Sequence, residues 1–323
     1  MRFKQKMLAR TVLVSSLLVS PTACFLDLSR HHYGYIPTTR LYSSDEGRVP
    51  YERRSPAVRS QQPLPTDALE LQMLSFYRFA PIEDPTKTRD ELFSAVEHIP
   101  GLRGTIYLAS EGVNAQLAVP CGEPLDSLLD ACSHRLPFDP FERNAPNLGD
   151  VVPISMPTFN RLIVRTRDAV LRDGLDSEDL DWDDAGLELT PTEWDQELRQ
   201  PESLFLLDCR NLYESEHGSF SSATPLKTKV FQESWQELEE ETKNVDKDQP
   251  IHIFCTGGIR CVKVGSYLKQ KLGFSDVRRL EHGIIGYHRW ASEHYQKESE
   301  SVWEGENFLF DKRRSEEEKT DEK

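Results

Sequence analysis

The sequence has 323 residues, of which 37% are hydrophobic and 29% charged, and its formal net charge is −15. This length is sufficient for two domains, and the composition predicts a soluble protein rather than a membrane protein. The acidic balance argues against a generally basic nucleic-acid-binding protein, so any contact with RNA has to come from a local patch.

The six cysteines, at positions 24, 121, 132, 209, 255 and 261, form no Cys-x-x-Cys pair. This spacing argues against a zinc ribbon and favours a reducing compartment.

Residues 1–60 are predicted to be a targeting leader that is removed or lacks fixed structure. A basic start precedes an apolar run from Thr11 to Ser20, which is too short to span a membrane. An arginine-rich stretch with serine and threonine follows, up to residue 60. The order resembles the bipartite leaders of algae with secondary plastids, with a cleavage site at residues 22–25. It predicts a chloroplast transit peptide and a plastid location; a secretory signal and a mitochondrial leader are the alternatives.

The segment from residue 70 to 170 is predicted to fold as the first domain, after a linker at residues 61–70. Its hydrophobic periodicity indicates strands, helices and turns in the order β-α-β-β-α-β. The predicted elements are a strand at 71–79, a helix at 85–99, strands at 104–108 and 115–119, a helix at 124–136 and a closing strand at 161–165. This order is typical of a ferredoxin-like, or acylphosphatase-like, domain.

Several arginines of this domain are candidates for RNA binding. Arg161, Arg165 and Arg167 alternate along the closing strand and therefore share one of its sides. Together with Arg78 and Arg103 they could form a phosphate-binding face. An ordinary solvated strand face is the alternative, and the spacing alone favours it.

An acidic connection at residues 171–190 leads to a second domain, predicted at 191–297. A buried strand from Ile251 to Phe254 leads into a short loop, and a helix follows from about Arg260 to Leu272, ending at Gly273. Residues 298–311 are expected to pack back on this domain, and the charged tail at 312–323 is expected to be disordered.

The loop between that strand and that helix is the strongest candidate for chemistry. It consists of Cys255, Thr256, Gly257, Gly258, Ile259 and Arg260. The two glycines let backbone N–H groups converge on the thiol, and the helix dipole and Arg260 add positive charge. We therefore expect a depressed pKa for Cys255, as in a nucleophile or sulfur carrier. A buried, inert cysteine is the alternative. The Cys-x4-Arg spacing is one residue shorter than the Cys-x5-Arg loop of cysteine phosphatases.

This loop resembles the active loop of a rhodanese domain, and in particular that of the rhodanese-domain tRNA uridine(34) hydroxylases. Five further segments are similar to that family, at residues 101–106, 110–114, 207–214, 280–285 and 305–311. The resemblance covers about residues 70–311 and implies a rhodanese α/β domain with a central parallel sheet after the ferredoxin-like domain.

The resemblance also implies an activity. It is the oxygen-dependent hydroxylation of uridine 34 in the tRNA anticodon to 5-hydroxyuridine, with Cys255 as the reacting thiol. Molecular oxygen would be the co-substrate, tRNA the partner, and no cofactor or metal is implied. The alternatives are a sulfurtransferase that carries sulfane sulfur as a Cys255 persulfide, and a non-catalytic rhodanese-like binding module.

Five further residues near the loop are candidates for a role, and for the first two the resemblance implies it. Asp208 and Arg210 are expected to form a structural ion pair near the active loop. Cys261 is either a buried core cysteine, which its helical face favours, or a resolving thiol. Lys263 could bind phosphate at the loop mouth or be a plain surface lysine. His282 replaces a glycine of the family, and it could aid proton transfer or be incidental.

Overall fold

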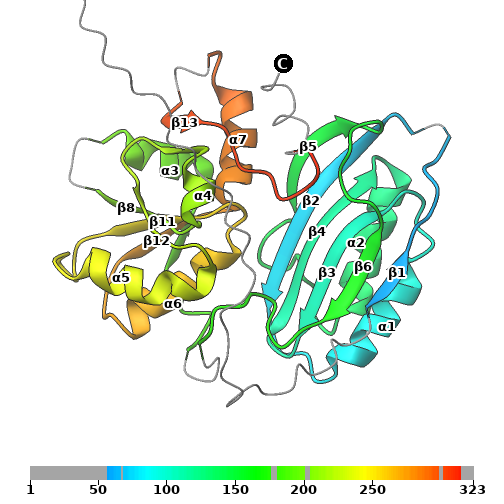
Figure 1. The fold of residues 1–323 in the computed structure, drawn as a ribbon, viewed down its shortest axis with the longest axis horizontal. Coiled ribbons are helices and arrows are strands. Elements are labelled where there is room, and N and C mark those ends of the chain that lie inside the picture. The colour runs from blue at the N-terminus through cyan, green and yellow to red at the C-terminus, as the bar shows by residue number, and fades with distance from the viewer. Residues whose placement is uncertain (1–56, 67, 176–179, 201–203, 298–300, 314–323) are drawn as a thin grey trace, which may run out of the picture. The chain divides into compact units, whose positions relative to one another are not determined.

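A computed structural model describes residues 57–66, 68–175, 180–200, 204–297 and 301–313, all of which belong to one compact unit. The predicted cleavage site, most of the predicted leader and the end of the charged tail lie outside the described residues. The described residues form two domains, each built on its own sheet (Figure 1). None of the helices described has the length and apolar character needed to cross a membrane.

The first domain is a six-stranded sheet with two helices on one face (Figure 1). Its strands, in order across the sheet, are β1 (Val58–Ser60), β6 (Leu162–Thr166), β3 (Arg103–Ala109), β4 (Gly112–Pro120), β2 (Glu70–Phe79) and β5 (Asn147–Pro153). The helices α1 (Pro85–Val96) and α2 (Glu123–Arg135) pack on alternate side chains of these strands, such as Ile106 and Val164. In the part of the chain that the structure describes, the opposite face of the sheet carries no helix of this domain.

The ferredoxin-like topology is confirmed, but its closing strand was wrongly assigned. The fourth strand of the β-α-β-β-α-β unit is β5, which pairs antiparallel with β2. The predicted closing strand is β6, an additional strand that lies parallel to β3. β1 pairs with β6, so Val58–Ser60 belong to the sheet although the sequence places them in the leader.

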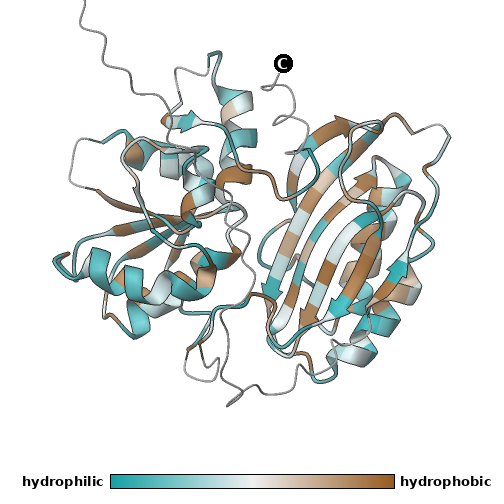
Figure 2. Ribbon diagram, viewed as in Figure 1, coloured by the Kyte–Doolittle hydropathy of each residue, from teal (hydrophilic) through white to brown (hydrophobic). Residues whose placement is uncertain are grey.

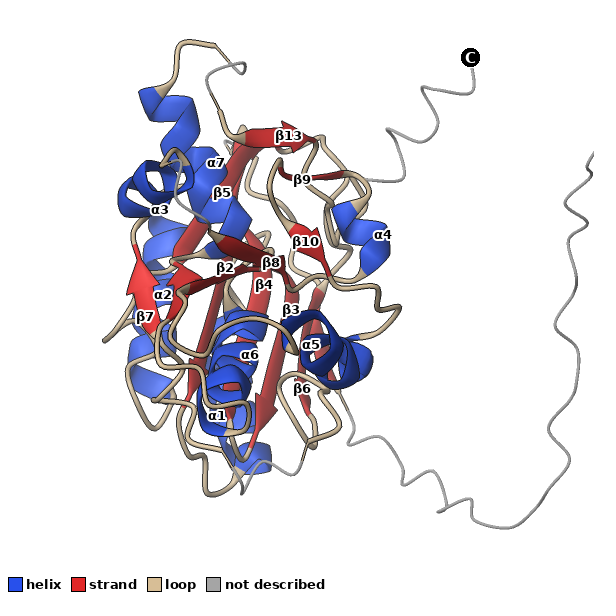
Figure 3. Cartoon of the chain, turned by 90° about the vertical axis from the view of Figure 1, so that its left-hand side faces the viewer, coloured by secondary structure: helices blue, strands red, loops and turns tan. Residues whose placement is uncertain are grey.

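The second domain is a five-stranded parallel sheet with helices on both faces. Its strands, in order, are β10 (Thr224–Pro225), β8 (Phe205–Asp208), β11 (Ile251–Phe254), β12 (Val277–Leu280) and β7 (Leu187–Leu189). Figures 1 and 3 show α3 (Pro191–Leu198) and α7 (Gly283–His294) on one side, and α5 (Ser234–Thr242) and α6 (Ile259–Gln270) on the other. β7 lies within the stretch predicted to be an acidic connection, so part of that stretch belongs to the sheet.

Burial explains why these elements pack as they do. All four residues of β11 are buried, as expected for a central strand that is covered on both faces. In Figure 2 the central strands of the second domain are largely hydrophobic, whereas its outer helix α5 is mostly hydrophilic. α3 begins with a capping box, in which Thr190 and Glu193 bind each other's backbone N–H groups.

The chain returns to this domain near its C-terminus. β13 (Trp303–Gly305) pairs antiparallel with β9 (Gly218–Phe220), beyond the short helix α4 (Leu212–Ser215). A 3-10 turn, η2 (Phe231–Glu233), precedes α5. The segment after β13 runs on to residues 306–313, which contact both domains.

Candidate active site

Cys255 lies immediately after β11, where the parallel strand ends and the chain turns into α6. Its side chain is 1% exposed, and the Gly258 N–H donates a hydrogen bond to Sγ over 3.2 Å. Gly258 has φ 95°, in the left-handed region that favours glycine, and this conformation precedes the first residue of the helix. The local sequence therefore brings the thiol and a backbone donor together, as predicted.

The predicted lowering of the Cys255 pKa is wrong. Burial raises the pKa of the thiol well above its usual value, and the neighbouring Cys261 thiol adds to this shift. Arg260 and the Cys261 backbone act in the opposite direction, but they do not outweigh the loss of solvent. Cys255 is therefore held as a neutral thiol in an apolar setting.

Arg260 acts to lower the pKa of Cys255, as the sequence predicts, but its charge is also paired. Its guanidinium forms two hydrogen bonds with Glu214, from Nη1 to Oε1 over 2.6 Å and from Nη2 to Oε2 over 2.7 Å. The same guanidinium donates to Thr256 Oγ1 over 3.0 Å, and the Thr256 hydroxyl donates to Glu214. These side chains are buried, so the pair also fixes the shape of the active loop.

Two further thiols are buried beside the active loop. Cys261, in the first turn of α6, and Cys209, just after β8, belong to the same hydrophobic cluster as Cys255. Burial is the largest cause that raises the pKa of Cys261 as well, and the hydrogen bond with Cys209 is the second. This setting agrees with the core interpretation of Cys261, and the nearness of Cys255 leaves the resolving-thiol interpretation as a prediction.

The predicted ion pair between Asp208 and Arg210 is present and fully buried. Arg210 donates from Nε to Asp208 Oδ1 over 2.8 Å and from Nη2 to Gly218 O over 2.6 Å. The pair thus joins the end of β8 to β9, next to the active loop.

The turn that connects β12 to α7 also supports the active loop. The backbone N–H groups of Ile284 and Ile285 donate to the carbonyls of Cys255 and Thr256 over 3.0 and 3.1 Å. His282, at the start of α7, has φ 57°, and among the described residues it alone combines a positive φ with a side chain. Its carbonyl accepts a hydrogen bond from Asn147 Nδ2 over 2.9 Å, which ties the first domain to this turn.

A cavity of about 640 Å³ opens between the active loop and the helix-free face of the first sheet. One wall carries Cys255, Thr256 and Gly257, and the opposite wall carries Ser75 and Tyr77 of β2. The remaining lining comes partly from the C-terminal segment at residues 306–311. The Cys255 thiol therefore lines a space that neither domain encloses by itself.

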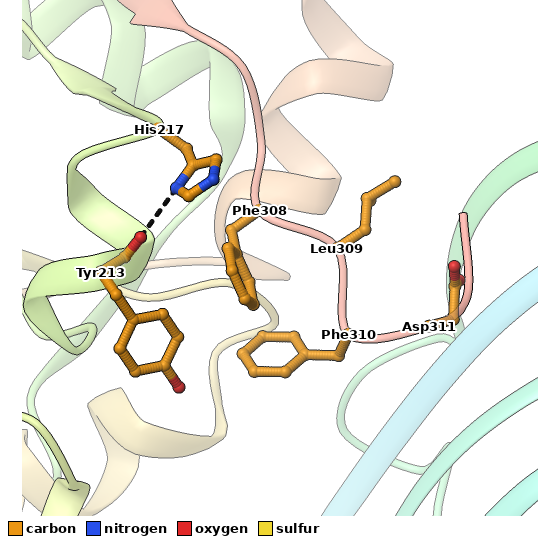
Figure 4. A pocket seen from close by; sticks show the side chains of 6 residues that line it. All are labelled: Tyr213, His217, Phe308, Leu309, Phe310 and Asp311. Carbon is orange, nitrogen blue, oxygen red and sulfur yellow. Dashed lines mark hydrogen bonds between the residues drawn. The ribbon is translucent and has the colours of Figure 1, made fainter. Parts of the chain in front are cut away.

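A second hollow, of about 430 Å³, shares part of that C-terminal wall. Figure 4 shows the rings of Tyr213, Phe308 and Phe310 close together, with His217 above them. The ring of Phe308 lies 5.2 Å from the ring of Tyr213 and 5.1 Å from that of Phe310, in edge-to-face contacts. These contacts hold the segment against α4, whose Glu214 supports the active loop.

Comparisons with known proteins agree with this two-domain site. One family model, the UPF0176 acylphosphatase like domain, matches residues 71–170, and the rhodanese-like domain model matches residues 190–290. The tRNA uridine(34) hydroxylase of Citrobacter koseri is 34% identical over 260 residues, which cover 77% of this chain and 71% of that protein. The chain belongs to the tRNA uridine(34) hydroxylase family.

Two other members of the family are the tRNA uridine(34) hydroxylases of Leptospira interrogans and Enterobacter sp., both 35% identical. The alignments cover 74% and 75% of this chain, but 62% and 66% of those proteins. The chain thus spans slightly less than two thirds of the length of these two relatives. A crystal structure of a rhodanese-like domain protein from Staphylococcus aureus is 22% identical, with a TM-score of 0.27, over 31% of this chain and 90% of that chain.

Lys263 of this family member does not face the mouth of the active loop, so the predicted phosphate contact is wrong. Its side chain is buried between two carboxylates, Asp173 and Glu111, with Nζ 2.9 Å from Glu111 Oε2. The rings of Trp182 and Phe79 lie nearby, with Nζ 4.7 and 5.4 Å from their centroids. Lys263 therefore joins α6 to the β3–β4 turn of the first domain.

The arginines predicted to form one RNA-binding face divide between two faces. Arg103 and Arg165 alternate with core residues, so they lie on the helix-free face, and the exposed Arg161 continues that side of β6. Arg78 is two residues after Phe76 on β2, so the two side chains lie on the same face, and Phe76 belongs to the helix-covered core. Arg78 donates a hydrogen bond to Glu142 over 3.5 Å. The predicted face therefore loses Arg78 and keeps the other four, since Arg167 lies over the ring of Tyr107 on the helix-free face.

The sequence reasoning missed two side chains that shape the site. Glu214 carries the paired charge of Arg260, and the only signal was its place at the end of the 207–214 segment that resembles the family. Asn147 begins the strand that was not predicted, and it contacts the His282 carbonyl. Within the described ranges, no group of three or more His, Cys, Asp or Glu side chains is placed to hold a metal ion.

Proposed function

We propose that this chain hydroxylates uridine 34 of the tRNA anticodon to 5-hydroxyuridine, with Cys255 as the reacting thiol and molecular oxygen as co-substrate. The observation that carries the proposal is the similarity to tRNA uridine(34) hydroxylases across both domains, including the loop that holds Cys255. The activity needs both domains in this account, because the cavity at the thiol has one wall from each.

The geometry supports an unpaired base as substrate. Anticodon nucleotides are single-stranded, so a protein can take one base out of the stack at a small cost. A cavity of about 640 Å³ has room for a nucleoside beside the thiol. Arg103, Arg161 and Arg165, on the helix-free face of the first sheet, supply a local positive patch for the RNA backbone in an otherwise acidic protein.

An oxygen-18 experiment with purified protein tests this function. Uridine, molecular oxygen, two electrons and two protons give 5-hydroxyuridine and water, so the assay contains dithiothreitol as the reductant. We expect an anticodon stem-loop with uridine 34 to gain one oxygen-18 atom from labelled oxygen gas. An unlabelled hydroxyl group would refute the oxygen requirement, and an unmodified RNA would refute the hydroxylase function.

Sulfur transfer is the second candidate. It is favoured by the rhodanese loop itself, in which the Gly258 N–H faces Cys255 Sγ, a position that suits a sulfur adduct on the thiol. Thiosulfate would then transfer its outer sulfur atom to the Cys255 thiolate and leave as sulfite. The added sulfur would be visible in the intact mass, and no hydroxylated nucleoside would form. A binding module would give neither product.

We further propose that residues 1–60 direct the protein to the plastid through a bipartite leader. The support is the order of a short apolar run and an arginine-rich stretch in the sequence. A fusion of residues 1–60 to a fluorescent protein, expressed in an alga with secondary plastids, should accumulate in the plastid. Accumulation in the mitochondrion or the secretory pathway would contradict this proposal.

A further inference from the structure

Tyr77 lies closer to the active loop than any sequence pattern indicates. It is on β2, on the helix-free face of the first sheet, and it lines the cavity that also contains Cys255. A Cβ atom placed on Gly258 would be only 2.8 Å from Tyr77 Oη. The phenol hydroxyl therefore rests against the residue whose N–H binds the thiol, and glycine at position 258 makes that approach possible.

The hydroxyl of Tyr77 has no protein partner among the described residues, unlike two other tyrosines of the chain. Tyr287 donates to Asp195 over 2.8 Å, and Tyr267 donates to Glu239 over 2.7 Å. Burial, followed by the negative charge of Glu188, raises the pKa of Tyr77 above its usual value. Tyr77 is thus a neutral donor at physiological pH, with its hydrogen available.

A half-buried donor that lines a cavity requires an acceptor when the cavity is filled and water is displaced. Uracil is neutral and has two carbonyl oxygens on its ring, whereas a phosphate group would be better matched by a charged donor. We propose that Tyr77 Oη donates a hydrogen bond to a carbonyl oxygen of the uracil ring held beside Cys255. The inference rests on the proposed function and names a residue that touches the substrate base.

Binding of two RNAs by two variants tests this contact. The RNAs are anticodon stem-loops that carry either uridine or an abasic site at position 34. The variants are Tyr77→Phe and the matched control Tyr107→Phe, which lies on the same face of the sheet but outside the cavity lining, beneath Arg167 at 3.4 Å. Dissociation constants come from fluorescence anisotropy, and melting curves check that both variants fold.

We expect Tyr77→Phe to bind the uridine RNA about tenfold more weakly and the abasic RNA with unchanged affinity, because only the first contains the acceptor. Tyr107→Phe should change neither. An equal change for both RNAs, or no change for either, would overturn the inference, since a purely structural tyrosine does not distinguish them. Equal binding of the two RNAs by the wild-type protein would overturn it without any variant.

The same samples separate this inference from the proposed function. If the wild-type protein makes 5-hydroxyuridine and Tyr77→Phe keeps full affinity for the uridine RNA, only the role of Tyr77 fails. If the wild-type protein makes none while Tyr77→Phe loses affinity for the uridine RNA alone, the base contact stands and the hydroxylase function fails.

Discussion

Glu214→Gln tests the account of the active loop, because it removes one charge from a buried pair and keeps the side-chain shape. Both side chains of the pair are nearly or fully buried, and Glu214 accepts two hydrogen bonds from Arg260. Breaking a buried ion pair by removing one partner costs about 3–5 kcal/mol of folding stability. Because the glutamine amide keeps the shape of the side chain, we expect a loss of about 3 kcal/mol. For a chain of this size the midpoint of thermal unfolding should fall by about 6–12 °C.

Calorimetry with a matched variant provides the measurement. Glu216→Gln makes the same substitution two residues away at an exposed position, so it should leave the unfolding midpoint within about 2 °C of the wild type. A Glu214→Gln midpoint that also stays within this range would refute the reasoning that the pair holds the loop.

The pH dependence of the same pair has a definite sign. Burial alone would raise the pKa of Glu214, but the charge and hydrogen bonds of Arg260 outweigh burial and lower it. A lowered pKa in the folded state stabilises the protein above the unfolded value, near 4.3, and this stabilisation is lost as the pH falls through the folded value. The wild type should therefore lose its stability advantage over Glu214→Gln in acid, below about pH 4.

Three further predictions follow from buried or strained groups. Because the pKa of Cys255 is raised, its alkylation by iodoacetamide should be slow at pH 7 and accelerate only above about pH 9, as measured by peptide mass spectrometry. His282→Gly should raise stability by about 1 kcal/mol in denaturant titrations, because glycine tolerates its positive φ. Lys263→Met should lower stability by about 3 kcal/mol in the same titrations, because it leaves the carboxylates of Glu111 and Asp173 facing each other without a cation.

Each of these predictions has a result that contradicts it. The exposed Cys121 is the internal reference for alkylation, and a Cys255 rate at pH 7 equal to that of Cys121 would contradict the buried, neutral thiol. A destabilised His282→Gly would mean that the packing of the imidazole outweighs the backbone strain. A Lys263→Met variant with normal stability but weakened RNA binding would restore the phosphate contact that the structure argues against.

The features that were predictable from the sequence are those determined over short stretches of chain. The apolar run before Cys255, the two glycines and the helix after them are contiguous, so the strand, the loop and the position of the thiol could be predicted. The resemblance of residues 207–214 to the rhodanese pattern likewise indicated the pairing of Asp208 and Arg210. The strand β5 was missed because its sequence, Asn147–Pro153, contains glycine and proline and buries only its first and sixth residues.

The features that were not predictable depend on contacts between distant segments. The charge of Arg260 is paired with Glu214, 46 residues earlier, and its effect on the Cys255 pKa does not outweigh burial. Lys263 is buried because Glu111 reaches it from the other domain, 152 residues away. The pKa of Cys255 likewise depends on the depth at which the loop is buried, which motif spacing does not contain.

The most direct test of the central claim is nucleoside mass spectrometry of tRNA from cells that lack their own uridine(34) hydroxylase. The cells would express either the wild-type chain, without residues 1–56, or Cys255→Ala. The account predicts 5-hydroxyuridine and its derivatives with the wild-type chain and none with Cys255→Ala at equal protein levels. Equal amounts of 5-hydroxyuridine with both chains would contradict the role of the thiol, and its absence with both would contradict the proposed function.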